Sequence, residues 1–454
     1  MRHRTNDLGN DPVFPLVCRL AIPTMLAQLV NVLYSIVDRI YISNIPVDGA
    51  LALAGVGVCG PIVTLLSSFA SLVGLGGSPI MAMRMGAGKK KQASRILNTC
   101  FLMLCALSVV LTILFLLTKG TLLRWFGTSP STFDYANTYL TIYTAGTFFA
   151  LMANGMNSFL ICQGFSGLGM VTVTLGAVLN IVLDPVFIFV LNMGVAGAAI
   201  ATVLSQMASC AFVLLALRRK SMPIPLGVRG FRWDIVRRVL SFGLSPFFII
   251  ATDSVLLIVL NTVLQRYGGP QLGDTLVTCA TIVQSYLLLI TMPMGGMTLG
   301  TQPVISFNYG AGQTDRIKKA LVSIIGLCLV FCAVMMIATH TVSHYFVRLF
   351  TSDAEIMQRS VHYIKIFTAM ILPLGVQYPL VDSITALGHV RLALFCSMFR
   401  KSTYLLALLL LPMLISAEAT FFAEPVADVL AATVTTILFL RAFPKILAQC
   451  SAGK

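Results

Sequence analysis

The chain has 454 residues, of which 57% are hydrophobic and only 10% are charged. A soluble domain carries about 25% charged residues, so this composition excludes an ordinary soluble protein. The formal net charge is +15. Membrane proteins gather Lys and Arg in the loops on one side of the bilayer, so the charge requires no nucleic-acid partner.

Twelve apolar segments follow one another along the chain, each long enough to cross a bilayer. About 20 apolar residues span a membrane as a helix. Backbone polar groups in lipid must be satisfied within helices or closed barrels, and the alternation of a barrel strand is absent. The predicted spans lie near 16–42, 52–80, 94–118, 134–160, 168–191, 195–217, 235–265, 275–305, 320–346, 356–386, 390–415 and 421–442.

The second half of the chain repeats the first with an offset of 224 residues. Residues 75–88 recur without a gap at 299–312, so that Leu-Gly, Pro and Gly-Ala-Gly coincide. The same offset pairs Tyr139 with Tyr363. Repeats of this size in an apolar chain are common in secondary transporters. We therefore predict an all-α polytopic membrane protein with twelve transmembrane helices in two pseudo-symmetric six-helix bundles.

A polar segment, residues 218–234, separates the two halves and contains two Pro, two Gly and five basic residues. We interpret it as a cytoplasmic linker between an N-terminal lobe (1–217) and a C-terminal lobe (235–454). Lys and Arg favour the N-terminal side of the membrane by roughly three to one. This bias predicts a multi-pass protein of the cell inner (plasma) membrane with both termini in the cytoplasm. We expect a monomer in the lipid bilayer.

Acidic residues inside the spans are the first candidates for a functional site, because an intramembrane carboxylate is costly. Asp38 lies in the first span, Asp253 in the seventh and Asp382 in the tenth. Asn180 and Asp184 share one face of the fifth span, since they are four residues apart. Such carboxylates can bind and release a proton or, beside Asn and Thr oxygens, hold Na⁺. Pairing with Arg, capping of broken helices and contact with water are the alternatives.

Arg400 and Lys401 lie about 13 Å into the eleventh span, at 1.5 Å per residue. Three interpretations are open: they pair with a buried acid, they extend to the membrane surface, or they contact an anionic ligand. No Ser/His/Asp or metal-ligand constellation predicts an enzyme, and no cofactor is expected beyond the coupling ion.

Several short motifs are spread over both halves: Ala21-Ile22-Pro23, Val37-Asp38, Pro79 to Gly88, Gly164, Leu179 to Pro185, Gly194 to Ala199, Gly300 to Pro303 and Asn308 to Gly312. Through these motifs the chain resembles the multidrug and toxic compound extrusion (MATE) family over nearly all of residues 12–445, and its arrangement resembles the DinF-like and archaeal branch.

The resemblance implies alternating access and the export of amphipathic, mostly cationic small molecules, driven by entry of H⁺ or Na⁺. It implies a first-lobe cation-coupling site formed by Asp38, Asn157, Asn180, Asp184 and Thr202. Na⁺ would bind at Asp38, Asn180, Asp184 and Thr202. It also implies a second-lobe substrate or cation site near Asp253 and Asp382. The alternative is a lipid-linked oligosaccharide flippase of the same superfamily. Arg400 and Lys401 favour that alternative, whereas the twelve spans and the buried Asp residues oppose it.

Overall fold

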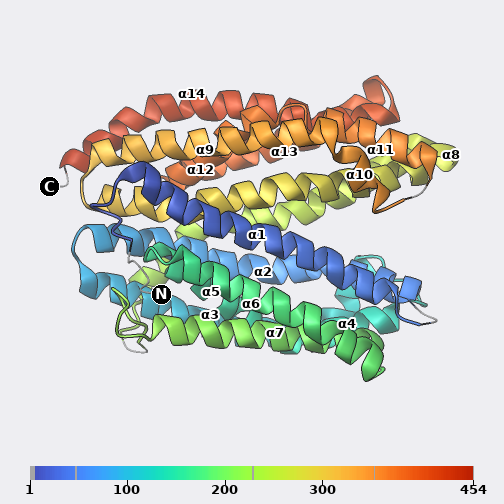
Figure 1. Cartoon of the computed structure of the whole chain (residues 1–454), viewed down its shortest axis with the longest axis horizontal. Helices are drawn as coiled ribbons and strands as arrows, with labels where there is room; N and C mark the ends of the chain where they lie inside the picture. The colour runs from blue at the N-terminus through green and yellow to red at the C-terminus, as the bar shows by residue number, and fades with distance from the viewer. Residues whose placement is uncertain (1–5, 47–48, 228–229, 352, 453–454) are drawn as a thin grey trace.

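The computed structural model describes residues 6–46, 49–227, 230–351 and 353–452, and every regular element in these ranges is a helix (Figure 1). The first half contains α1 (Val13–Ser43), α2 (Gly49–Gly86), α3 (Lys90–Trp125), α4 (Phe133–Ala145), α5 (Thr147–Cys162), α6 (Ser166–Pro185), the π-helix η1 (Val186–Val190) and α7 (Gly194–Leu217). The second half contains α8 (Trp233–Gly310), α9 (Thr314–Thr341), α10 (Ser343–Arg348), α11 (Ala354–Phe367), α12 (Ile371–Ala386), α13 (Val390–Leu414), the 3₁₀-helix η2 (Ala417–Phe422) and α14 (Ala423–Ala452).

The predicted number of spans is confirmed. Within the described ranges, 10 helices are long and apolar enough to cross a membrane. Two further spans are bent: α4 and α5 meet at 57°, and α11 and α12 meet at 51°. Helix α8 supplies two spans, because its backbone is broken at Gly269, where φ is 63°. Counting each bent pair once gives 12 spans.

The predicted duplication is present in the backbone as well as in the sequence. The two bent spans are the fourth and the tenth. Two pairs of glycines with left-handed backbone also match, because Gly88 and Gly312 have φ of 72° and 70°, while Gly164 and Gly388 both have φ of 87°. Both pairs are 224 residues apart, and glycine adopts this conformation at little cost. Each lobe therefore turns its chain at equivalent places.

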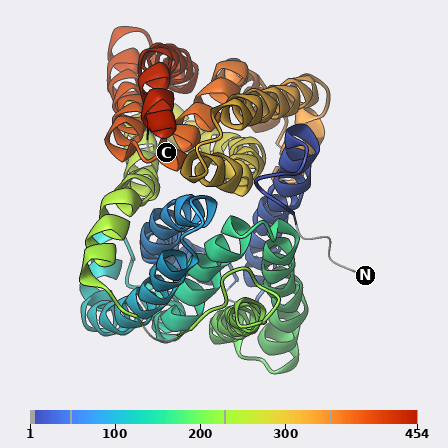
Figure 2. The same ribbon diagram turned by 90° about the vertical axis from the view of Figure 1, so that its left-hand side faces the viewer.

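Each lobe has its own hydrophobic core, but the first turns of each lobe cross to the other core. Leu16 and Leu20 of α1 are buried in the second-lobe cluster, and Val236 and Val239 of α8 are buried in the first-lobe cluster. Figure 2 shows both crossings, with α1 and the start of α8 on opposite sides of the molecule. The division at residues 217 and 235 stays a prediction, and these two helices fasten the lobes together.

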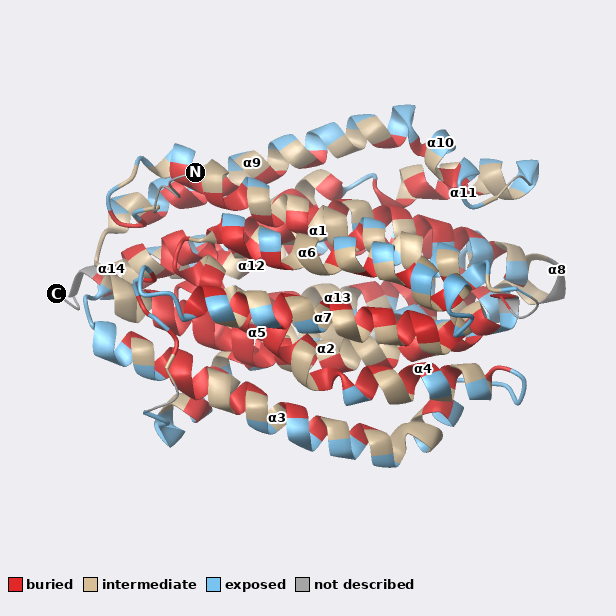
Figure 3. Ribbon diagram, turned by 60° about the horizontal axis from the view of Figure 1, so that its bottom comes forward, coloured by how far each residue is buried: buried red, intermediate tan, exposed pale blue. Residues whose placement is uncertain are grey.

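The outermost helices expose apolar side chains, as a lipid-facing surface requires. Figure 3 shows buried residues along the middle of the molecule and exposed ones on the outer sides of α3 and α9. Leu117 of α3 is 80% exposed, and Val322 of α9 is 71% exposed. These surfaces cannot be exposed to water over such an area in a soluble monomer.

The linker packs against the first lobe and is hydrogen-bonded to it. Met222, Ile224 and Leu226 are buried in the first-lobe cluster. The Ile224 amide donates to Gln163 Oε1 at 2.8 Å, and the Gly227 amide donates to Asn98 Oδ1 at 2.9 Å. Residues 228 and 229 lie outside the described residues.

The helix ends on the same side of the molecule as the linker are here called the inner ends. At the inner ends, the backbone of the first lobe contacts the backbone of the second. A Cβ added to Gly86 of α2 would lie 1.9 Å from the carbonyl oxygen of Phe307 of α8. A Cβ added to Gly310 would lie 1.9 Å from the carbonyl oxygen of Met83. Small residues allow such close helix contacts in membranes. The inner ends are therefore closed against each other.

We predict that Gly86→Ala opens the inner ends. The added methyl group must displace backbone, and overpacking of this kind costs about 1–3 kcal/mol, which shifts a two-state equilibrium by roughly 5- to 150-fold. Spin-label distances between the inner ends of α2 and α8 should lengthen. Gly60→Ala on the same helix is the matched control, because a Cβ there meets nothing within 4 Å. Equal distances in the two variants would contradict the prediction.

Candidate functional site

Two of the acids predicted from the sequence meet inside the first lobe. The carboxyl of Asp38 in α1 and that of Asp184 in α6 are within hydrogen-bonding reach of each other. Asp184 is fully buried. No ion pair within the described residues involves either acid. Two ionised carboxylates this close repel each other, so a proton or a cation between them stabilises the pair.

Asn180 and Thr202, which the family resemblance placed in the same site, lie beside these acids. The Asn180 amide donates from Nδ2 to Asp184 Oδ1 at 3.2 Å and to Thr202 Oγ1 at 3.3 Å. The Thr202 hydroxyl itself donates to the carbonyl oxygen of Ala198 at 2.9 Å. Helix α6 continues directly into the π-helix η1 after Pro185, and π-turns within helices often occur at functional sites.

Several oxygens of this group have no partner. Asp38 Oδ1, Asn180 Oδ1 and Asp184 Oδ2 are buried without a hydrogen-bond donor. A buried acceptor left unpaired costs about 1–3 kcal/mol. Carboxylate, amide and hydroxyl oxygens are the ligands that hard cations prefer, and a proton between the two carboxyls would also satisfy them. The donor set fits H⁺ or Na⁺.

Three tyrosines around the acids were not predicted from the sequence. Tyr34 lies one turn before Asp38 on α1, and Asp38 acts electrostatically on both Tyr34 and Tyr139. Tyr139 stacks on Tyr143, with ring centroids 6.2 Å apart. The four-residue spacing of Tyr34 and Asp38 could have identified the first. The recurrence of Tyr139 at position 363 could have identified the second.

Asn157 does not join this group. Its Oδ1 is buried without a partner and lies 3.2 Å from the place of a Cβ on Gly169. Gly169 precedes Asp184 by about 22 Å along α6, at 1.5 Å per residue. A role of Asn157 in cation coupling stays a prediction.

The second-lobe charges form ion pairs with one another. Lys401 of α13 pairs with Asp253 of α8, and Arg400 pairs with both Glu424 and Asp428 of α14. Among the alternatives for Arg400 and Lys401, the structure therefore shows pairing with acids inside the spans. Glu424 and Asp428 were missed as candidates, although their four-residue spacing is the same signal that singled out Asn180 and Asp184.

Asp382 of α12 lies apart from these pairs. Thr298 of α8 is its hydrogen-bonding neighbour, and the Gln302 amide donates to its backbone oxygen at 3.3 Å. No hydrogen bond within the described residues links Asp382 to Asp253. The predicted second-lobe site therefore consists of one acid paired with Lys401 and one acid beside a hydroxyl.

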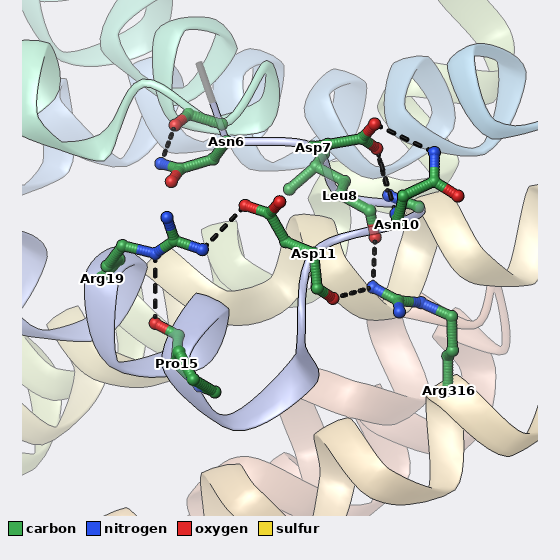
Figure 4. A network of polar contacts seen from close by, with 10 residues as sticks. Asn6, Asp7, Leu8, Asn10, Asp11, Pro15, Arg19 and Arg316 are labelled. Carbon is green, nitrogen blue, oxygen red and sulfur yellow. Dashed lines mark hydrogen bonds and ion pairs between the residues drawn. The ribbon is translucent and has the colours of Figure 1, made fainter. Parts of the chain in front are cut away.

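Residues 6–11, here called the N-terminal strap, bridge the inner ends of both lobes (Figure 4). The Asn6 amide donates to the carbonyl oxygen of Gly164 in the first lobe at 2.8 Å. In the second lobe, Arg316 Nη2 donates to the carbonyl oxygens of Leu8 at 3.2 Å and Asp11 at 2.8 Å. The strap is thus hydrogen-bonded across the closed interface.

The strap is not a pH sensor at neutral pH. Hydrogen bonds from the Asn10 side chain and from the amides of Gly9 and Asn10 hold the pKa of Asp7 below its ordinary value of 3.8. A lowered pKa contributes stability above the unfolded value and loses it only as the pH falls below that value. Asp7 therefore stays ionised throughout the neutral range.

Sequence comparison assigns the family. The MatE family profile matches residues 23–186 and 250–413, one match in each repeat. The chain belongs to the MatE family. The multidrug export protein MepA of Staphylococcus aureus (strain N315) is 21% identical over 431 residues, covering 94% of this chain and 93% of that protein. MepA of Staphylococcus haemolyticus is 22% identical over 425 residues, covering 92% of each.

Solved structures of MATE transporters share the fold. An outward-facing multidrug resistance MATE family transporter of the MOP superfamily superposes with a TM-score of 0.90 at 23% identity, covering 98% of this chain and 99% of that chain. A MOP superfamily transporter from Pyrococcus furiosus gives the same TM-score, identity and coverage. These matches confirm the two-bundle helical fold, while the DinF-like branch stays a prediction.

Removing the Arg316 side chain should release the N-terminal strap. Hydrogen bonds from a charged donor are worth about 1.5–3 kcal/mol, so in Arg316→Ala the amides of residues 6–11 should exchange hydrogen on the order of tenfold faster. Lys318→Ala on the same helix is the control, because it removes only an exposed contact to Asp315 at 3.8 Å. Unchanged exchange in Arg316→Ala would show that other contacts hold the strap.

Proposed function

We propose that this protein is an H⁺- or Na⁺-coupled antiporter that exports amphipathic, mostly cationic compounds by alternating access. The observation that carries the proposal is the Asp38–Asp184 carboxyl pair, which is buried beside Asn180 and Thr202 with unpartnered oxygens. A driving ion needs a site that binds it inside the membrane and later releases it. An intramembrane carboxylate pair that forms no ion pair within the described residues meets this requirement.

Helix α1 offers a physical route from ion binding to movement of the lobes. Its first half packs into the second-lobe core, and its second half carries Asp38 against α6 of the first lobe. A proton or Na⁺ between Asp38 and Asp184 would draw the outer half of α1 toward α6. The same helix would transmit this change to the other lobe. Ligand binding shifts such an equilibrium only by its different affinity for the two states.

The substrate class follows from the composition and from the relatives. The chain contains 21 Met and 28 Phe. Met side chains adapt to many shapes, and aromatic faces attract cations. The related MepA proteins are named multidrug export proteins, which supports a broad substrate range. Asp382 and the paired Asp253 are proposed contacts for the substrate or a cation.

The flippase alternative loses its main support. It relied on Arg400 and Lys401 as a cationic surface for a pyrophosphate. Arg400 is instead bound by Glu424 and Asp428, and Lys401 by Asp253. A ligand phosphate would have to displace these carboxylates, and breaking a buried ion pair costs about 3–5 kcal/mol.

Asp184→Asn should abolish uphill efflux while the protein stays folded, because it removes the charge that binds the ion. Asp38→Asn should act nearly as strongly. The assay is efflux from proteoliposomes with the pH gradient and the Na⁺ gradient imposed separately, which also identifies the ion. Asp315→Asn is the control, since its side chain is 87% exposed and far along the chain from the site. Normal uphill export by both site variants would disprove the first-lobe site.

Cells that lack their own pumps should accumulate less ethidium or tetraphenylphosphonium when they produce this protein. Because Met and Phe side chains offer few polar groups to a ligand, affinity should be in the micromolar range, on the order of −8 kcal/mol of binding free energy. Accumulation of a panel of lipophilic cations, with and without the protein, measures this. Unchanged accumulation of every cation, together with selective binding of a lipid-linked pyrophosphate, would favour the flippase.

A further inference from the structure

The second lobe carries five charged side chains in one corner, formed by α8, α13 and α14. They are Asp253, Arg400, Lys401, Glu424 and Asp428. These helices supply spans seven, eleven and twelve. In the repeat, those spans correspond to spans one, five and six, which carry Asp38, Asp184 and Thr202. The same corner of the repeat therefore holds the intramembrane charge in both lobes, with different residues.

The charges of the second-lobe corner do not cancel. Two basic side chains face three acidic ones, which leaves one negative charge in excess. Asp253 can tolerate its charge, because its side chain is 55% exposed and pairs with Lys401. The side chains of Arg400, Glu424 and Asp428 are only 12%, 8% and 0% exposed. An uncompensated charge at such burial is very costly.

The excess falls on Asp428. Its Oδ1 accepts both hydrogen bonds from Arg400, from Nε at 3.0 Å and from Nη2 at 2.9 Å. Its Oδ2 is buried and has no partner. Arg400 also donates to Glu424, so one guanidinium serves two carboxylates. One carboxylate of the pair is left without a full counter-charge.

The other groups around Asp428 supply no further positive charge. Lys401 acts on it electrostatically but is already paired with Asp253. Tyr378 of α12 and Cys332 of α9 also face it, and both are neutral side chains. Tyr404 of α13 lies near Glu424. On α11 and η2, Arg359 and Glu418 pair with each other.

We propose that Asp428 is a second proton-binding residue of this transporter, loaded independently of the first-lobe carboxylates. A proton on Asp428 Oδ2 brings the corner to neutrality while Oδ1 keeps both bonds from Arg400. A metal cation is disfavoured there, because it needs several oxygen ligands and the guanidinium repels it. The proposal goes beyond the proposed function, since it does not depend on which ion the first lobe binds.

Loading and unloading of this proton would change the charge of a network that includes a residue of α8. Arg400 joins α13 to α14, and Lys401 joins α13 to α8. Helix α8 is the one whose first turns pack into the first-lobe core. The proton would therefore act on the second crossing helix, as the first-lobe site acts on α1.

Infrared difference spectroscopy on the purified full-length protein tests the proposal, with the pH changed from about 5 to about 10 to deprotonate buried carboxyls. Asp428→Asn should remove one carbonyl band of a protonated carboxyl. That band should shift in protein labelled with ¹³C at the aspartate side-chain carboxyl and stay in place with labelled glutamate. The assignment of the proton to Asp428 would be overturned if the band persisted in Asp428→Asn. It would also be overturned if the band shifted with labelled glutamate instead of labelled aspartate.

Two further variants keep the test decisive if Asp428→Asn fails to fold. Glu424→Gln leaves two acidic and two basic side chains in the corner, so Asp428 should be ionised without a bound proton. The same band should therefore disappear although Asp428 is intact. A retained band would refute the charge count. The double variant Asp38→Asn with Asp184→Asn should keep the band. Loss of the band in the double variant would show that proton binding at Asp428 depends on the first lobe. If the double variant loses efflux but keeps the band, the result bears on the proposed function and supports independent protonation of Asp428.

Discussion

The inner closure of this transporter depends on backbone contact between α2 and α8, which the glycines at positions 86 and 310 permit. Lipid provides no hydrophobic drive between helices, so close packing has to supply the attraction. Both glycines belong to the segment that the duplication repeats, so each lobe presents its own glycine to the backbone of the other. A reciprocal contact of this kind joins two equivalent surfaces and can be made or broken as a unit.

The crossing helices extend this reciprocity from the interface to the charged corners. Helix α1 begins in the second-lobe core and ends beside Asp184 of α6, and α8 begins in the first-lobe core and reaches Lys401 of α13. Each charged corner therefore contains the helix that is rooted in the opposite lobe. Electrostatic change in a corner acts on that helix directly, without a long chain of intermediate side chains.

The sequence predicted the elements that follow from local pattern. Hydropathy identified the spans, the offset of 224 residues identified the duplication, and helical spacing placed Asn180 beside Asp184. Local pattern alone could not predict that Asp38 would reach Asp184, because that contact joins the first span to the fifth, and only the family resemblance placed the two acids in one site. Glu424 and Asp428 were missed because they lie near the start of a span, where acids are ordinarily solvated. In the structure both acids are buried and pair with Arg400, because the tertiary fold packs α13 against α14.

The two charged corners occupy equivalent positions in the duplicated fold but compensate their negative charge in different ways. In the first lobe the acids form no ion pair within the described residues, and Arg39 acts on Asp38 only electrostatically, so a cation held between the two acids is one that can leave. In the second lobe Arg400 and Lys401 are covalently fixed, so most of the negative charge is compensated permanently. A mobile ion changes the charge of the first corner, whereas fixed cations keep the second corner within one charge of neutrality. That difference makes the first lobe the natural place for the driving ion, even though both lobes share one architecture.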